Sequence, residues 1–143
     1  MKSTNNANYE DFKINVKIKI SALWISLMFC YVYGDIFGFF VPGRINDIQA
    51  GIMGLGAITQ GVLLGTSVAL AIPSLMVFLS LILTPKVNRW VNIILGTVFI
   101  LGPALTMQGS WVFYKFYSVV EIVISGLIVW FAWNWPAQTG TSD

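Results

Sequence analysis

Four long apolar stretches constrain this chain more than any other feature. A helix that crosses a bilayer needs about 17 to 25 mostly apolar residues, because the hydrocarbon core is about 30 Å thick. Residues 21–40, 59–83, 90–106 and 111–133 meet that requirement. Lipid offers no water to hydrogen-bond with the backbone, so a spanning segment is either a helix or part of a closed barrel. The sequence therefore predicts an all-α membrane protein whose four transmembrane helices form a compact bundle.

The composition agrees with a membrane protein. Hydrophobic residues make up 57% of the 143 residues and charged residues 10%, whereas soluble domains carry about 25% charged residues. We expect a polar, basic juxtamembrane segment at 1–20, the transmembrane domain at 21–135 and a short tail at 136–143. The glycine-rich stretch that starts at Ile48 is predicted to be an interfacial loop or a short surface helix.

The basic residues predict which way the helices run. Lys13, Lys17 and Lys19 precede the first span, and Lys86 and Arg89 stand between the second and third. Basic residues that flank spans are retained in the cytoplasm, so both termini are expected there. The tryptophans fit two interfacial belts, with Trp24, Trp90, Trp130, Trp133 and Trp135 on the inner side and Trp111 on the outer side.

The same lysines suggest a lipid partner. Residues 12–20 alternate between apolar and polar side chains, but a lone strand would have no sheet to join, so we interpret this stretch as lying along the headgroups. Lys13, Lys17 and Lys19 could hold anionic lipid there, at about 1 kcal/mol each near the surface.

The lack of histidine and the single cysteine limit the kinds of metal, cofactor and disulfide site that the chain can form. The chain has no histidine, and Cys30 is its one cysteine. Histidine-ligated haem, the usual zinc sites and an intrachain disulfide are therefore excluded, and we expect no metal and no cofactor. The sequence has no dense basic patch with interleaved aromatics, so nucleic acid is not an expected partner. An enzyme is not favoured.

Two acidic residues fall within the spans and define a candidate polar pocket. Charged residues in a membrane are costly, so Asp35 and Glu121 are expected to face the protein interior. Tyr31 and Tyr117 each lie four residues before one of these acids, on the same helix face. If the first and fourth spans are neighbours, these side chains would share an outer-leaflet pocket. Gln60 and Thr59 enter the second span at a similar depth and complete the candidate set.

Two interpretations of the acids remain open. Two carboxylates in one pocket repel each other and resist charging, which suits exchange of a proton for a cation or capture of an organic cation against tyrosine rings. Alternatively, Asp35 and Glu121 could be structural, paired with Arg44, Lys115 or a tyrosine hydroxyl.

Small residues predict where helices approach closely. In lipid, association depends on close packing over small side chains. In the second span, the small residues Ala57, Gly61, Gly65 and Ala69 recur at every fourth position. The first span carries Gly34 and Gly38. These stripes predict packing of the first two spans on each other or across a homodimer. Pro73 interrupts the second span and is interpreted as a structural kink.

Several stretches resemble a known family. They are Leu23-Trp24-Ile25, Tyr31 to Phe37, Thr59-Gln60-Gly61 through Met76, Val87 to Ile93, Glu121-Ile122-Val123 and Val129 to Trp133. Together they resemble a family of small bacterial four-helix membrane proteins catalogued only as a domain of unknown function. The resemblance implies a bacterial plasma-membrane location and the four-helix topology, and it carries no activity or ligand.

Three classes of function remain open from the sequence. The first is a small proton- or cation-coupled transporter or binding protein that uses the acidic pocket. The second is a structural or regulatory membrane partner that acts through the small-residue stripes. The third is a membrane enzyme acting on a lipid or quinone, for which the acid pair is the one catalytic candidate. The molecular activity itself does not follow from the sequence.

Overall fold

Four long helices form the body of the protein in the computed structural model, which describes residues 12–54 and 56–136. They are α1 (Val16–Gly38), α3 (Gln60–Ile82), α4 (Pro85–Thr106) and α5 (Val112–Trp133). Each is long and apolar enough to cross a membrane. The prediction of four packed helices that are long and apolar enough to span a membrane is therefore confirmed. Most of the expected polar start and of the tail, residues 1–11 and 137–143, lies outside the described residues.

A small cap joins α1 to α3. It consists of the short helix α2 (Arg44–Gln49) and two short antiparallel strands, β1 (Ile52–Met53) and β2 (Gly56–Ala57). Gly43 precedes α2 with φ of 85°, a left-handed conformation that glycine adopts without steric cost. The glycine-rich stretch thus folds as a surface helix followed by a hairpin, where the sequence predicted a loop or a surface helix.

Two helices begin earlier than the apolar stretches that predicted them. The side chain of Asn15 accepts a hydrogen bond from the Lys17 amide at 2.9 Å, so α1 begins at Val16 rather than Ser21. Lys17 and Lys19 are therefore helical. Helix α4 begins at Pro85 rather than Trp90, because proline suits the first helical position, where its missing N–H is not needed.

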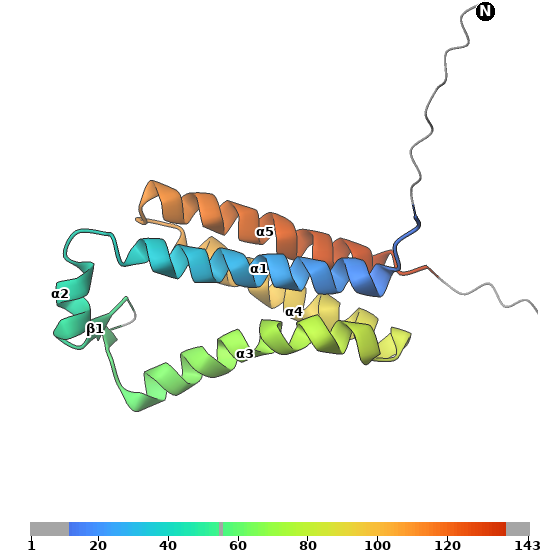
Figure 1. Ribbon diagram of the computed structural model, residues 1–143, viewed down its shortest axis with the longest axis horizontal. Helices are drawn as coiled ribbons and strands as arrows, with labels where there is room; N and C mark the ends of the chain where they lie inside the picture. Colours follow the sequence, from blue (N-terminus) through green and yellow to red (C-terminus); the bar gives the residue numbers. More distant parts are fainter. Residues whose placement is uncertain (1–11, 55, 137–143) are drawn as a thin grey trace, which may run out of the picture.

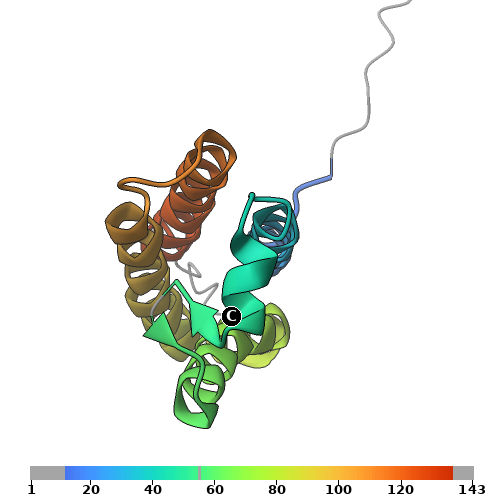
Figure 2. The same cartoon turned by 90° about the vertical axis from the view of Figure 1, so that its left-hand side faces the viewer.

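The helices are arranged around the bundle in the order α3, α1, α5, α4. Helix α1 packs against both α3 and α5, and α5 packs against α4, whereas α3 and α4 share few contacts. Figures 1 and 2 show this arrangement from the side and from one end. Residues 13–19, the α3–α4 turn and the end of α5 gather at one end, which we call the basic end. The α2 cap and the α4–α5 turn lie at the other, which we call the hairpin end.

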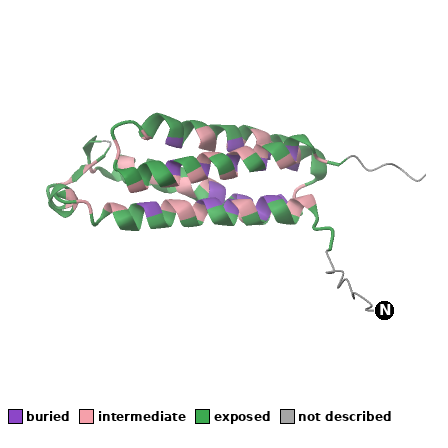
Figure 3. Cartoon of the chain, turned by 90° about the horizontal axis from the view of Figure 1, so that it is seen from above, coloured by how far each residue is buried: buried purple, intermediate pink, exposed green. Residues whose placement is uncertain are grey.

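The best-packed part of the bundle lies toward the basic end. Its fully buried side chains come from the first half of α1, the second half of α3 and the second half of α5: Ile20, Trp24, Leu27, Met76, Ile128 and Ala132. Figure 3 shows that most other positions on the helices are exposed. Many of these carry large apolar side chains, as expected of a surface that lipid covers.

Helix α3 bends about halfway and then diverges from α1 toward Gln60 (Figure 1). Pro73 is buried at the bend, and proline removes the hydrogen bond to the carbonyl four residues earlier. No residue of α3 before Pro73 is buried. The hydroxyl of Ser67 donates to Leu63 O at 2.8 Å, and so it does not bond to the Ala69 carbonyl that Pro73 leaves free. Pro73 therefore separates a packed half of α3 from an unpacked half.

The small residues that were predicted to bring helices together differ in whether they contact another helix. Gly34 lies against the ring of Tyr117, because a methyl group in place of its hydrogen would lie 4.0 Å from that ring, so α1 approaches α5 there. Gly38 and Gly65 have no such neighbour within 4 Å, and Gly61 has only the Thr59 side chain beside its own helix. Ala57 and Ala69 are exposed. The stripe on α3 therefore makes no close helix contact within the described part of this chain.

Among the described glycines, Gly96 has the closest contact with a neighbouring helix, and the sequence did not lead us to expect it. A methyl group at this position of α4 would lie 2.8 Å from Val129 Cγ2 and 3.4 Å from the carbonyl oxygen of Ser125 on α5. Only glycine leaves room for this contact, so Gly96 sets the spacing of α4 and α5.

The Gly96→Leu substitution should therefore destabilise the protein. Overpacking a close contact costs about 1–3 kcal/mol in the free energy of unfolding. Gly102→Leu is the matched control, because Gly102 lies on α4 with nothing within 4 Å. Thermal unfolding in detergent should show a lower Tm for Gly96→Leu and little change for Gly102→Leu. Equal Tm values for the two variants would contradict the assignment.

Candidate functional site

The pocket predicted from the sequence requires α1 and α5 to be neighbours, and they are. Their contact in the hairpin-end half is aromatic: the ring of Phe37 stacks on Tyr117 at 6.3 Å between centroids and meets Phe113 at 6.4 Å. Gly34 lies against the same Tyr117 ring. The first and fourth spans are therefore adjacent along the part of each helix that carries an acid.

Glu121 lies inside the bundle. It belongs to the buried face of α5, which recurs every three or four residues through Ser118, Glu121, Ser125, Ile128 and Ala132. Only 6% of Glu121 is exposed. Its side chain makes no hydrogen bond or ion pair with the described residues, but its carboxylate oxygens are not fully buried atoms. The hydroxyl of Ser125, one turn away, is fully buried and has no partner among those residues.

Asp35 differs from Glu121 in exposure and depth. Its side chain is exposed, and it lies about 5 Å along the axis from the end of α1 at Gly38, whereas Glu121 lies about 14 Å from the start of α5. No ion pair joins Asp35 to Arg44 in the described part of the chain. Asp35 therefore lies near the hairpin end of the bundle, and Glu121 lies further from that end.

The two tyrosines of the candidate set contact different helices. Tyr31 is half-buried, and its ring packs against Phe99 of α4 at 6.2 Å between centroids. Tyr117 is held between Phe37 and Phe116. Tyr117 thus lies at the α1–α5 contact, whereas the ring of Tyr31 contacts α4.

Gln60 and Thr59 do not join this group. Both are exposed at the start of α3, the end of the helix that diverges from α1. The hydroxyl of Thr59 accepts a hydrogen bond from the amide of Val62 and so caps α3. Residues 59 and 60 were placed in the pocket by their depth alone, and depth does not fix the distance between helices.

A buried hydrogen-bond network was not predicted. The indole N–H of Trp24 on α1 donates to Asn92 Oδ1 on α4 at 2.7 Å. Asn92 Nδ2 donates to Asn88 Oδ1 at 2.6 Å, and Asn88 Nδ2 donates to the carbonyl of Ser80 on α3 at 2.6 Å. Trp24 is fully buried, so its assignment to the interfacial belt was wrong. Two asparagines four residues apart in an apolar span are the signal that points to such a network.

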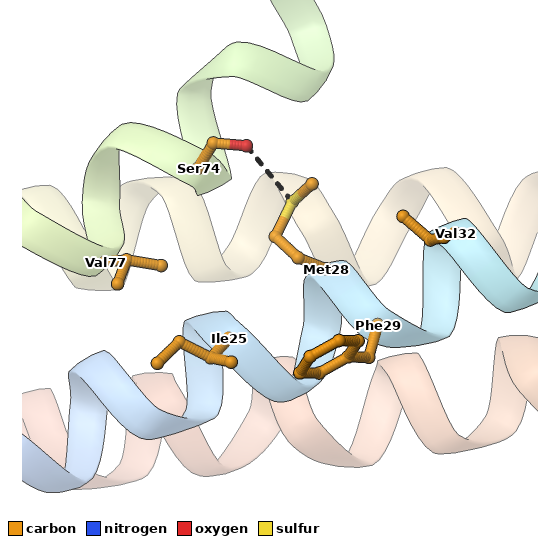
Figure 4. A pocket seen from close by; sticks show the side chains of 6 residues that line it. All are labelled: Ile25, Met28, Phe29, Val32, Ser74 and Val77. Atoms are coloured by element: carbon orange, nitrogen blue, oxygen red, sulfur yellow. Dashed lines mark hydrogen bonds between the residues drawn. The ribbon is translucent and has the colours of Figure 1, made fainter.

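An apolar groove lies on the outside of the bundle between α1 and α3. Its volume is about 320 Å³, and Figure 4 shows its lining: Ile25, Met28, Phe29, Val32, Ser74 and Val77. The one polar group drawn there, the hydroxyl of Ser74, donates to Met28 Sδ at 3.6 Å and to Leu70 O at 3.0 Å. The groove offers shape and apolar contact but no group for chemistry.

Comparison with known proteins gives a family without an activity. A family model described as a family of unknown function (DUF6326) matches residues 9–142. The chain belongs to this family, which confirms the resemblance to a domain of unknown function. No curated protein and no solved structure matches the chain.

The Asn92→Leu substitution tests the buried network. Leucine has a similar volume but cannot accept the Trp24 N–H or donate to Asn88. A buried donor left unpaired costs about 1–3 kcal/mol. Thermal or denaturant unfolding should show that loss for Asn92→Leu and much less for Thr97→Val, which removes an exposed hydroxyl from the same helix. If both variants unfold like the wild type, the network does not stabilise the fold.

Proposed function

We propose that this chain of the DUF6326 family is a small membrane protein that binds a proton or a cation at Glu121, which the ligand reaches past Asp35 from the hairpin end. The observation that carries the proposal is the position of Glu121, which is only 6% exposed and makes no hydrogen bond or ion pair with the described residues. Ionisable groups inside a membrane domain are costly to retain, so a functional role is the first hypothesis for one without a partner.

The surroundings of Glu121 support cation chemistry. Burial of a carboxylate away from water favours either a bound proton or a bound cation, because each neutralises the charge. The phenol rings of Tyr31 and Tyr117 present π faces near the path, which attract organic cations. Asp35 adds a second negative charge where the path meets water. A small proton- or cation-coupled transporter or binding protein fits these features.

The positive-inside rule supports an orientation for this site. Lys13, Lys17, Lys19, Lys86 and Arg89 all belong to the basic end, so we propose that the basic end and both termini face the cytoplasm of a bacterial cell. The hairpin end, with Asp35, would then face the outside of the plasma membrane.

Infrared spectroscopy of the protein in lipid tests whether Glu121 takes up a proton. We expect a protonated-carboxyl band that moves with pH and disappears in Glu121→Gln. Asp47→Asn is the matched control, since Asp47 is an exposed acid in α2 at the hairpin end. A pH-dependent band that survives in Glu121→Gln would refute the assignment of proton binding to this residue.

Thermal stability across cations tests ligand binding. Sodium, potassium, tetraethylammonium and tetraphenylphosphonium would each be compared at constant ionic strength. A ligand at about 100 times its Kd adds about 2.7 kcal/mol to the free energy of unfolding. We expect at least one cation to raise the Tm of the wild type and Asp47→Asn but not of Glu121→Gln, with a weaker response in Asp35→Asn. The same response in all four proteins would exclude the acid pair as a cation site.

A second candidate function is that of a structural or regulatory membrane partner. The observation that favours it is the unpacked half of α3, where Gly61, Gly65 and Ala69 lie away from the other helices. Small residues let two membrane helices approach closely. We propose a second copy of this chain as the partner of that face.

Cross-linking in lipid vesicles tests this pairing. Gly65→Leu should lower the dimer fraction, because a large side chain separates the helix backbones. Leu64→Ala is the control, since it changes an exposed neighbour that lies off the stripe. A dimer fraction that is unchanged in Gly65→Leu, or a wild type that is monomeric at all lipid ratios, would rule out pairing through this face.

A further inference from the structure

The basic end holds a large cavity that the acidic site does not involve. Its volume is about 940 Å³, and it lies where the segment before α1, the start of α4 and the end of α5 meet. Five cationic side chains line it: Lys13, Lys17, Lys19, Lys86 and Arg89. The acidic residues within the described part of the chain, Asp35, Asp47 and Glu121, do not. The described lining of the cavity is therefore basic.

Three of the five cations are held in place by contacts with the protein. Lys17 Nζ donates to the carbonyl oxygens of Leu81 and Leu83 at 3.1 and 2.7 Å, so it caps the C-terminal end of α3. Lys19 Nζ lies 5.4 Å from the ring centroid of Phe131. The guanidinium carbon of Arg89 lies 5.8 Å from the ring centroid of Trp133. Contacts with aromatic faces fix a cation without neutralising it.

Two features point to an anion rather than to a merely solvated surface. The Nε of Arg89 is buried and has no hydrogen-bond partner among the described residues. In addition, α4 starts beside the cavity at Pro85, and Thr84 provides no side-chain cap for it. The first amide groups of a helix carry its positive dipole end and bind anions. Arg89, whose Nε is buried without a partner among the described residues, and the uncapped start of α4 therefore line the same cavity.

We propose that this cavity binds a phosphate group, and that the group belongs to the headgroup of an anionic membrane lipid. Phosphate fits because arginine and lysine bind it through charge-assisted hydrogen bonds. A lipid fits because the cavity lies at the ends of membrane-spanning helices, and its wall is partly apolar through Ile14, Val16, Phe131 and Trp135. Acyl chains could continue from there along the apolar surface of the bundle.

The test compares three ligands on the full chain purified in detergent. They are phosphatidylglycerol as the anionic lipid, phosphatidylcholine as the zwitterionic lipid, and glycerol phosphate as the soluble headgroup. Binding would be measured by native mass spectrometry for the lipids and by thermal shift for all three. The variant Lys19→Gln/Lys86→Gln/Arg89→Gln removes three cations but keeps Lys17, which caps the C-terminal end of α3. The control Arg44→Gln/Lys115→Gln removes cations at the hairpin end.

Each outcome decides the proposal. We expect phosphatidylglycerol to bind more tightly than phosphatidylcholine, and the triple variant to weaken this binding on the order of ten-fold or more, since each cation near an anionic surface contributes favourably. The control variant should bind like the wild type. If glycerol phosphate binds as tightly as the lipid and is lost in the triple variant, the phosphate site stands but the lipid assignment is overturned. If the two lipids bind equally, or the triple variant binds like the wild type, the whole proposal is overturned.

The single variant Arg89→Lys tests the geometry of the Arg89 side chain separately from its charge. It also provides a test that does not depend on whether the triple variant folds. Lysine keeps the charge but lacks the planar group that can bind phosphate through two parallel hydrogen bonds. We expect this single variant to keep the Tm of the unliganded protein and to bind phosphatidylglycerol several-fold more weakly. Unchanged affinity in Arg89→Lys would show that Arg89 does not contact the phosphate.

Discussion

The hydrogen bonds of Asn88 and Asn92 are the interaction on which the rest of the bundle depends. In lipid, apolar helices gain little from burying apolar surface against each other, so polar contacts and close packing decide which helices associate. Trp24, Asn92, Asn88 and the Ser80 carbonyl link α1, α4 and α3 through one continuous set of bonds. Helices α3 and α4 share few other contacts. The network therefore holds the bundle closed at the basic end, where the fully buried side chains also lie.

Away from that network the bundle loosens in a defined way. The seam between α4 and α5 remains tight, because Gly96 brings α4 against the backbone of Ser125. Helix α1 remains on α5 through Gly34, Phe37 and Tyr117. The half of α3 before Pro73 diverges from the bundle and has no buried residue. Helices α1, α5 and α4 thus stay in contact with one another in turn, and α3 leaves one side of the hairpin end less tightly packed.

Hydropathy predicted the four helices and the short surface segment between the first two, because lipid imposes both length and composition on a span. It missed the starts of α1 and α4, which depend on the local chemistry of Asn15 and Pro85. It also placed Trp24 in the belt, since an indole in a span looks the same in sequence whether its N–H meets a headgroup or a buried amide. The contact between α1 and α5 could only be assumed, because lipid-facing and interior faces are both apolar. The grouping of Thr59 and Gln60 with the acids rested on depth, which does not fix lateral distance.

Glu121 and the asparagine network both lie along the contact between α4 and α5. On the α5 side of the tight seam, Ser125 lies at the Gly96 contact and Glu121 lies one turn before it. On α4, Asn92 lies one turn before Gly96. Buried polar groups therefore follow the seam from the acid to the network at the basic end. A segment with few buried contacts opens at a lower free-energy cost than a well-packed one. Movement of the bundle should thus be confined to the first half of α3, with Pro73 as the pivot, while the seam keeps Glu121 and the asparagines at fixed spacing. Displacement of that half of α3 would leave the hydrogen bonds that hold the basic end together intact.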